Sequence, residues 1–221
     1  SLGLFGQLFN LKDEAIGDEF AINTTTNGNQ HNPDVDFFAD GSFIVCWQNM
    51  ASANSGINAQ IFSKDGQKIG SELVICSTTD VSRYAERVPS IVTLADDKML
   101  VTWSSFQHYS GGNSYEVYGQ IISNAGIAQG AAFQINTQDQ GNQSESDVQQ
   151  LSDGNIVVAY TDYFGLTNAG QSGVYAQIID QSGAQVGSEI EIYFENNLDA
   201  YDVELVALKQ GGFAASWTLW D

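Results

Sequence analysis

The sequence predicts an all-β fold built from four tandem repeats. Three observations support this prediction: short apolar runs recur at a regular distance, turn residues separate them, and only two prolines occur among 221 residues. Strands of about five or six residues that alternate apolar and polar side chains are typical of antiparallel sheets. Glycine and small polar residues fill the segments between the runs, as expected for short strands joined by turns.

The clearest repeat is an apolar run that ends in a large aromatic residue. Successive aromatic residues lie 56 or 57 positions apart, and a turn such as Asp40-Gly41 precedes each run. Asp-Gly between two alternating runs predicts a hairpin, because glycine adopts positive φ without a steric clash. We expect the aromatic side chains to wedge between neighbouring sheets. These positions are Trp47, Trp103, Tyr160 and Trp217.

A second hairpin precedes the aromatic hairpin in every repeat, and its first strand carries a glutamine at a constant position. A buried amide offers two donors and an acceptor, so we expect the glutamine to tie together strands of neighbouring sheets. A ring of amides that lines a channel is the alternative. The recurring residues are Gln7, Gln60, Gln120 and Gln177.

Each repeat therefore supplies four strands, and we expect one repeat domain, 1–221, with repeats 1–56, 57–116, 117–173 and 174–221. A single four-stranded sheet cannot bury its own faces, whereas several sheets can pack face to face around an axis. The predicted fold is a closed four-bladed β-propeller of antiparallel sheets. An open β-repeat array or a barrel-like assembly is the alternative.

The repeated order is G-Q-x-[FI], then Gly-x-E-[FI]-x-[IV]-N, then P-x-V-x-x-L-x-D-G-x-[FI]-V-V-x-W. It resembles the tandem propeller-like repeat of very large secreted, adhesin-like surface proteins. The resemblance covers the whole chain, although the fourth repeat departs from the pattern at Tyr193 and Gln210. It implies a propeller-like fold and an extracellular or cell-surface location. It implies no catalytic residue, because the shared positions are turns and core.

The charge balance narrows the choice of partners. Seven Lys and Arg residues face 27 Asp and Glu residues, so the formal net charge is −20. Nucleic acids and anionic lipid surfaces would be repelled, which leaves cations and neutral sugars as partners. No stretch of about 18 apolar residues is present in the sequence, so no membrane span is predicted.

Catalysis and metal binding have little support in the sequence. The two histidines, His31 and His108, belong to different repeats, and no nucleophile stands beside a base. A calcium loop needs closely spaced oxygen ligands. We therefore expect no enzyme activity, no cofactor and no metal, with calcium kept open because of the acidic composition. The closest approaches to a calcium motif are Asp34 with Asp36 and Asp199 with Asp202.

Two pairs of residues are candidate sites of covalent chemistry. Cys46 and Cys76 are the two cysteines, and they could form a disulfide in a secreted protein or remain as two free thiols. Asn23 and Asn142 each begin an N-x-[ST] sequence, which makes them candidate N-glycosylation acceptors.

The leading hypothesis from the sequence is a structural or interaction module of an extracellular surface protein or fibre. It would associate in tandem with like copies or neighbouring modules, as an excised or mature part of a longer chain. The alternative is a carbohydrate-binding propeller. It rests on the candidate ligand loop at Phe106, His108 and Tyr109, because aromatic rings pack on sugars while polar groups bind their hydroxyls. A propeller glycosidase with paired carboxylates is the remote alternative.

Overall fold

The computed structural model describes residues 3–51, 55–78, 86–109, 112–137, 141–163, 171–196 and 198–220. The regular elements in these ranges are β-strands, so the all-β prediction is confirmed. None of the described residues forms a helix that is long and apolar enough to cross a membrane. In chain order the strands are β1 (Phe5–Phe9), β2 (Ala15–Ala21), β3 (Gln30–Phe37), β4 (Phe43–Asn49), β5 (Ser55–Phe62), β6 (Lys68–Thr78), β7 (Glu86–Thr93), β8 (Lys98–Tyr109), β9 (Gly112–Ser123), β10 (Phe133–Gln134), β11 (Asn142–Gln150), β12 (Ile156–Tyr163), β13 (Gln171–Ile179), β14 (Ile190–Asn196), β15 (Asp199–Ala207) and β16 (Phe213–Trp220).

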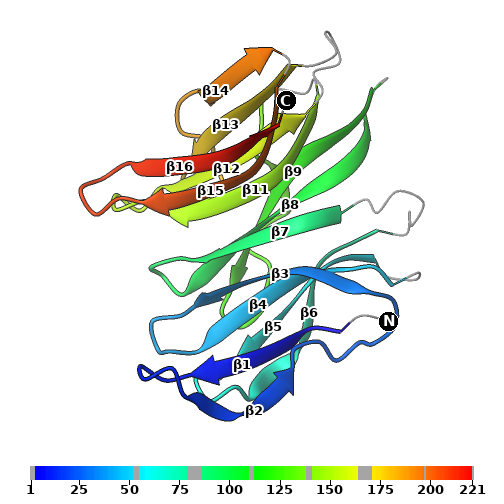
Figure 1. The fold of residues 1–221 in the computed structure, drawn as a ribbon, viewed down its shortest axis with the longest axis vertical. Coiled ribbons are helices and arrows are strands. Elements are labelled where there is room, and N and C mark those ends of the chain that lie inside the picture. Colours follow the sequence, from blue (N-terminus) through cyan, green and yellow to red (C-terminus); the bar gives the residue numbers. More distant parts are fainter. Residues whose placement is uncertain are drawn as a thin grey trace. The chain divides into compact units, whose positions relative to one another are not determined.

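The chain divides into two compact units, Ser1–Arg87 and Val88–Asp221. The first unit contains the hairpin β1–β2 and the four-stranded sheet β3-β4-β5-β6. The second unit contains the sheets β10-β9-β8-β7 and β11-β12-β13-β14 and the hairpin β15–β16 (Figure 1). Strand β7 begins at the junction between the two units.

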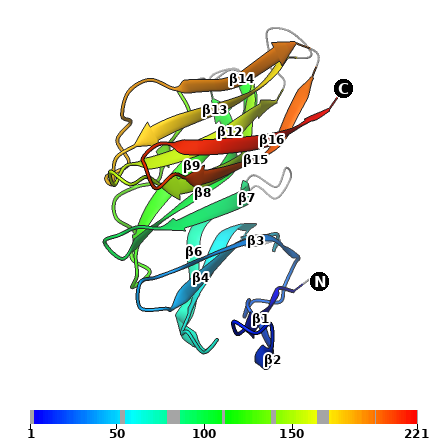
Figure 2. The same cartoon turned by 60° about the vertical axis from the view of Figure 1, so that its left-hand side comes forward.

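The sheets are shifted by two strands relative to the sequence repeats. Each four-stranded sheet joins the aromatic hairpin of one repeat to the glutamine hairpin of the next, so Trp47 on β4 pairs with Asn58 on β5. Likewise Tyr160 on β12 pairs with Tyr175 on β13. The first glutamine hairpin, β1–β2, and the last aromatic hairpin, β15–β16, therefore remain two-stranded (Figure 2).

The Asp-Gly turns form as the sequence predicts. Gly41 and Gly154 have φ of +85° and +89°, a region that glycine enters without strain. The Gly41 N–H donates to the Phe38 carbonyl (2.9 Å), and the Gly154 N–H donates to the Leu151 carbonyl (3.0 Å). These contacts close the tight connections of β3–β4 and β11–β12.

A bulge recurs in the first strand of each aromatic hairpin, and the sequence did not predict it. The ladder slips between His31 and Asp34 in β3, and the same slip occurs in β11 and β15. A bulge bends the strand and redirects its side chains. At the four equivalent positions non-glycine residues have positive φ, between 49° and 53°: Asn32, Val88, Glu145 and Asp202.

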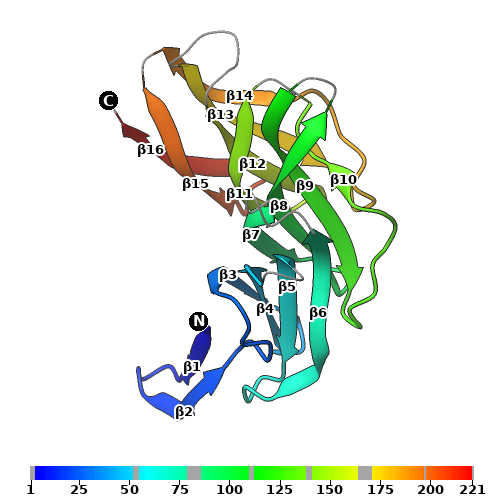
Figure 3. The ribbon, with the colours of Figure 1, turned by 90° about the vertical axis from the view of Figure 1, so that its right-hand side faces the viewer.

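The recurring aromatic residues lie in apolar clusters. In the first unit, Trp47 packs in the cluster shared by hairpin β1–β2 and sheet β3–β6. In the second unit, Tyr160 packs between the two four-stranded sheets, and Trp217 packs between sheet β11–β14 and hairpin β15–β16. Figure 3 shows the strands of these two sheets and of the hairpin. Trp103 is 2% exposed and stacks on Tyr118 with ring centroids 6.4 Å apart.

The recurring glutamines act within one hairpin rather than between neighbouring sheets, which corrects the expectation from the sequence. The Gln60 amide donates to the carbonyls of Ile61 and Ile69, at 3.0 Å each. It sits where the β5–β6 ladder slips, between Ala59 and Ile61. The amide thus hydrogen-bonds to carbonyls on both strands of the hairpin beside the slip. The other three glutamines, Gln7, Gln120 and Gln177, also donate to the carbonyl of the residue that follows them.

Candidate functional site

Polar side chains gather in the second unit where β8 and β12 end and β9, β11 and β13 begin. We call this place the strand-end edge. In the antiparallel ladders Gln143 on β11 pairs with Asp162 on β12, and Asp162 pairs with Gly173 on β13. In the neighbouring sheet, Glu116 of β9 pairs with Ser105 of β8. Antiparallel pairing therefore brings residues from three different hairpins to one edge.

A chain of hydrogen bonds connects two carboxyl groups at this edge. Glu116 is 4% exposed, and its oxygens accept from Ser114 Oγ (2.8 Å) and Asn136 Nδ2 (2.6 Å). The Asn136 amide also donates to Gln143 Oε1 (3.4 Å). Gln143 in turn donates from Nε2 to Asp162 Oδ1 (3.2 Å). Two fully or nearly buried amides thus fix the positions of Glu116 and Asp162.

Asp162 is harder to ionise than an ordinary carboxyl group. Burial raises the pKa of Asp162 from 3.8 to about 6. Hydrogen bonds from the Asn142 backbone and from Gln143 oppose this rise, and the charge of Glu116 adds to it. A carboxyl group with this pKa keeps its proton near pH 5 and can donate it.

Two glycines make room for this arrangement. A Cβ atom on Gly141, whose φ is +107°, would lie 2.1 Å from Asp162 Oδ1. A Cβ atom on Gly173 would lie 2.7 Å from the ring of Tyr175. The backbone therefore approaches Asp162 and Tyr175 more closely than any residue with a side chain would allow.

Tyr175 and Glu191 extend the site across sheet β11–β14. Tyr175 is half-buried, pairs with Glu191 on β14 and stacks on Tyr160 with centroids 6.4 Å apart. Burial, followed by the charges of Asp162 and Glu191, raises the pKa of Tyr175 to about 12. The phenol therefore lies within the field of both carboxyl groups, and Glu191 is the exposed one.

The first unit repeats this scaffold with different side chains. Asn23 and Gln30 form the same amide pair, with Asn23 Nδ2 3.2 Å from Gln30 Oε1. Asn23 Oδ1 accepts from the Leu4 N–H (2.8 Å), just as Asn136 Oδ1 accepts from the Val117 N–H (2.9 Å). Two residues beyond the aromatic position stands Asn49, where the second unit has Asp162.

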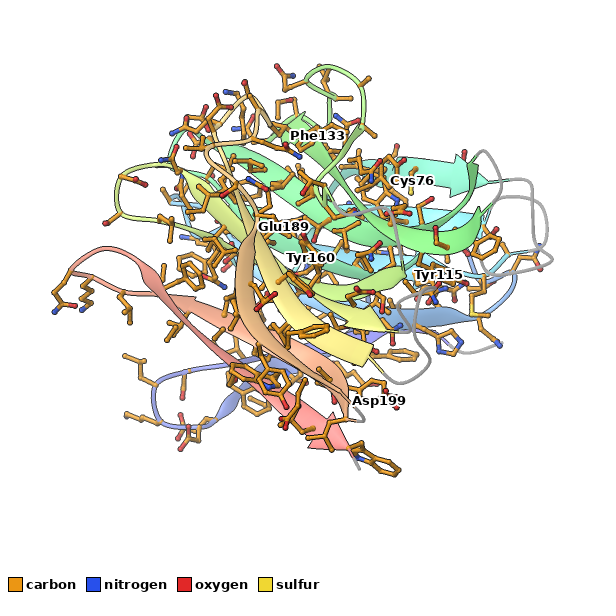
Figure 4. The ribbon with its side chains drawn as sticks, turned by 90° about the horizontal axis from the view of Figure 1, so that it is seen from above. Cys76, Tyr115, Phe133, Tyr160, Glu189 and Asp199 are labelled. Atoms are coloured by element: carbon orange, nitrogen blue, oxygen red, sulfur yellow. The ribbon has the colours of Figure 1, made fainter. Side chains whose placement is uncertain are left out.

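The candidate ligand loop falls only partly within the described residues. Phe106 lies on β8 and packs edge-on against Tyr115 of β9, with ring centroids 5.0 Å apart. Tyr115 precedes Glu116, and it lies nearer the strand ends than the interior Tyr160 (Figure 4). The side chains of His108 and Tyr109 lie outside the described residues. Phe106 therefore lies at the same end of the β8–β9 ladder as Glu116, and the ligand-loop prediction, which included neither Glu116 nor Asp162, stays a prediction.

The remaining candidate sites are the two cysteines and the two candidate glycosylation asparagines, and they lie on or beside the strands. Cys46 on β4 and Cys76 on β6 are free thiols with β5 between them, so the disulfide considered from the sequence is not formed. Two strand spacings of about 4.8 Å exceed the Cα separation that a disulfide spans.

Asn23 is 6% exposed, and its amide is used in the contacts described above. Asn142 Oδ1 accepts from the Tyr115 N–H (3.2 Å). The Asn23 amide nitrogen, where a glycan would attach, donates to Thr25 and Gln30, and glycosylation of Asn142 stays a prediction.

Sequence reasoning missed Glu116, Asp162, Asn136 and Gln143. One signal could have found the amides, since the Asn–Gln pair recurs in the first and third repeats at the same spacing. In the ranges that the structure describes, no group of three His, Cys, Asp or Glu residues is placed to hold a metal ion.

Comparison with known proteins supports the fold. No family model matches the chain, and no curated protein matches it. A protein of unknown function from Dyadobacter fermentans has a similar structure, with a TM-score of 0.66 at 12% identity over 88% of this chain and 64% of that one. The GH93 α-L-arabinofuranosidase of Fusarium graminearum, solved with arabinobiose, has a TM-score of 0.65 at 11% identity over 94% and 69%. An endo-arabinase from Bacteroides thetaiotaomicron has a TM-score of 0.58 at 13% identity over 92% and 76%.

At these identities the likeness concerns the fold, which is propeller-like with antiparallel sheets. The chain spans 64% of the Dyadobacter protein. The comparisons overturn two expectations from the sequence, the structural fibre module and the absence of enzyme activity. The similar structures include carbohydrate-active enzymes, an arabinofuranosidase and an arabinase. Glu116 and Asp162 do not recur in the other repeats, so a search limited to repeated positions passes over them. The resemblance to surface-protein repeats and the extracellular location stay predictions.

Proposed function

We propose that this chain is the carbohydrate-binding propeller of a carbohydrate-active protein, and that a sugar binds at the strand-end edge of the second unit. The observation that carries the proposal is the half-buried Asp162 carboxyl, held by the Gln143 amide and close to Tyr175. Carboxyl and amide groups fix sugar hydroxyls, and an aromatic ring packs on the apolar face of a sugar ring.

A neutral sugar fits this edge better than an acidic one. Glu116 places negative charge beside Asp162, Glu191 places it beside Tyr175, and the net charge of the chain is −20. An anionic ligand would be repelled at close range, whereas neutral hydroxyl groups can both donate to the carboxylates and accept from the amides.

Calorimetric titration tests the binding proposal. Arabinobiose is the first probe, because the Fusarium enzyme of similar fold was solved with it. A panel of neutral oligosaccharides and one uronic-acid oligosaccharide follow. We expect binding to a neutral member that Asp162→Ala abolishes, while the exposed Asp65→Ala serves as a matched control and binds like the wild type. Failure of every neutral probe to bind, or equal binding by Asp162→Ala, overturns the proposal.

Glycoside hydrolysis is the second candidate, and a specific pair of residues favours it. Asp162 keeps its proton to about pH 6, and Glu191 is a second, exposed carboxyl beside the same tyrosine. In glycosidases one carboxyl group protonates the leaving oxygen, and a carboxylate either attacks the anomeric carbon or activates water. Here Asp162 would donate the proton as the C–O bond breaks, and Glu191 would act at the anomeric carbon.

Release of reducing ends from arabinan and other neutral polysaccharides tests this second candidate. We expect activity to fall as pH rises through about 6, since Asp162 then loses the proton that it must donate. Flat activity through this pH range removes Asp162 from the role of acid. Binding without any product release would leave the carbohydrate-binding proposal intact and remove the hydrolytic one.

A further inference from the structure

A pocket of about 190 Å³ lies in the first unit, on the scaffold that repeats the strand-end edge. Five polar residues and two small apolar residues line it. The lining consists of Thr25, Asn27, Asn49, Ala51, Asn58, Glu72 and Val74. A pocket of this size holds about six waters at roughly 30 Å³ each. It is smaller than the sites of about 300 Å³ or more that enclose drug-sized ligands, so one sugar ring is the upper limit.

Three hydrogen bonds hold the carboxylate of Glu72 in place in the lining of the pocket. Glu72 Oε2 accepts from the backbone N–H groups of Thr24 (2.9 Å) and Thr25 (3.1 Å). Glu72 Oε1 accepts from Asn58 Nδ2 (2.7 Å). Since the amide nitrogen of Asn58 is turned toward Glu72, its Oδ1 is directed to accept a hydrogen bond within the pocket.

The rim combines polar and apolar surface. Thr25 and Asn27 are exposed and present a hydroxyl and an amide, and Val74 is 63% exposed and presents two methyl groups. A sugar ring carries hydroxyls at its edge and C–H groups on its faces, so it matches both halves of this rim. The single charge, on Glu72, is already stabilised by hydrogen bonds from three neutral donors, so the carboxylate does not need a cationic ligand.

The two carboxyl groups proposed for hydrolysis in the second unit have no carboxyl group at the equivalent positions of the first. Asn49 occupies the repeat position of Asp162, and Val74 occupies that of Glu191, because it pairs with Asn58 as Glu191 pairs with Tyr175. An amide and a methyl-bearing side chain can hold a sugar but cannot transfer a proton to it.

We propose that the first unit carries a second site, which binds one neutral monosaccharide or the terminal sugar of a glycan without hydrolysing it. The ligand class is inferred from the pocket itself, so the site stands or falls independently of the strand-end edge. Together the two sites would allow one chain to hold a glycan at one place and act on it at another.

The test is an NMR titration of the intact chain with neutral monosaccharides, including L-arabinose, D-xylose and D-galactose, and with D-glucuronate as the anionic comparison. We expect a neutral sugar to shift the amide signals of Thr25, Asn27 and Asn58. Val74→Glu should weaken this binding at least tenfold, because it removes the apolar wall. Val35→Glu is the matched control, since Val35 is 60% exposed in the same unit and lies outside the pocket.

Each outcome has a defined meaning. Shifts at Thr25, Asn27 and Asn58 that Val74→Glu abolishes and Val35→Glu preserves support the second site. Absence of these shifts with every neutral sugar, or equal affinity in Val74→Glu, overturns it. Signals of Gln143 and Tyr175 report the strand-end edge in the same spectra, so failure of one site is distinguished from failure of the other.

Discussion

The two units place different chemistry on the same backbone scaffold. Both have an Asn–Gln amide pair and a close-approaching glycine at equivalent positions. The second unit then carries Asp162 and Glu191 where the first carries Asn49 and Val74. The repeated residues therefore build the edge of the sheet, and the residues that depart from the repeat determine what the edge can do. A function search restricted to repeated positions finds the scaffold and misses the chemistry.

Asp162→Asn, which gives the second unit the amide of the first, should have the largest effect. If Asp162 donates the proton, kcat for glycoside hydrolysis should fall by about 10²–10⁴-fold, a rise of about 3–5 kcal/mol in the barrier. KM should change little, because the amide keeps the shape of the carboxyl. Steady-state kinetics on the active substrate measure both constants. Unchanged kcat would show that the acidic residue at this position is not what distinguishes the two units.

Alanine substitutions of the two close-approaching glycines should have the next largest effect, and the size of the effect should differ between the two units. Gly28→Ala and Gly141→Ala both place a side chain at positive φ, +78° and +107°, which costs about 1–3 kcal/mol in strain. The added Cβ at residue 28 would meet backbone atoms of Met50 and Ala51 at 2.6 Å, whereas at residue 141 it would meet the Asp162 carboxyl. A carboxyl can rotate and backbone cannot, so Gly28→Ala should lower the unfolding free energy more in urea melts.

A double mutant sharpens this comparison. Combining Gly141→Ala with Asp162→Ala should recover part of the lost stability, because the carboxyl that clashes is gone. Strictly additive losses would mean that the clash contributes nothing and that φ strain accounts for the whole cost.

Exchanging the acid and the amide between the two units should change the stability at pH 8 in opposite directions. The pKa of Asp162 is raised from 3.8 to about 6, so its contribution to stability is present below pH 4 and is lost as pH rises through 6. Asp162→Asn should therefore match the wild type at pH 4 and exceed it by about 1–3 kcal/mol at pH 8. The reverse change, Asn49→Asp, places a carboxyl at a residue that is 3% exposed and should destabilise the protein mainly at pH 8. Thermal melts at both pH values measure the differences, and an Asp162→Asn effect that is equal at pH 4 and pH 8 would contradict the assigned titration.

The strand content followed from the sequence because each strand has a local signature. Alternating apolar runs and glycine turns such as Asp40-Gly41 determine hairpins through nearest neighbours alone. Grouping the hairpins into sheets depends on pairing across long loops, which short-range patterns do not specify. The expected sheets were therefore out of phase with the observed ones, and the partner of Gln60 was placed in the wrong sheet.

The site was harder to predict because its parts are far apart in the sequence. Glu116 and Asp162 belong to different sheets, and they are linked through two amides only because these sheets pack on a shared core. Each alone looks like one of 27 acidic residues. The Asn136–Gln143 pair was readable as a repeat of Asn23–Gln30, but its meaning depended on the carboxyl groups that it joins.

The smallest expected effect concerns the glutamates that connect each sheet to the loop before it. Glu72 accepts from the Thr24 and Thr25 backbones and from Asn58, whereas Glu189 accepts from the Thr137 N–H (3.4 Å) and hydroxyl (2.7 Å). A Gln substitution replaces one accepting oxygen with a donor. Glu72→Gln should therefore cost about 1–2 kcal/mol and Glu189→Gln about 0.5–1 kcal/mol, as measured by urea unfolding at pH 7. Because Glu72 also orients Asn58, Glu72→Gln should weaken monosaccharide binding in the first unit, while Glu189→Gln should not. Equal losses of stability together with unchanged sugar binding would show that Glu72 only ties down the loop and does not shape the pocket.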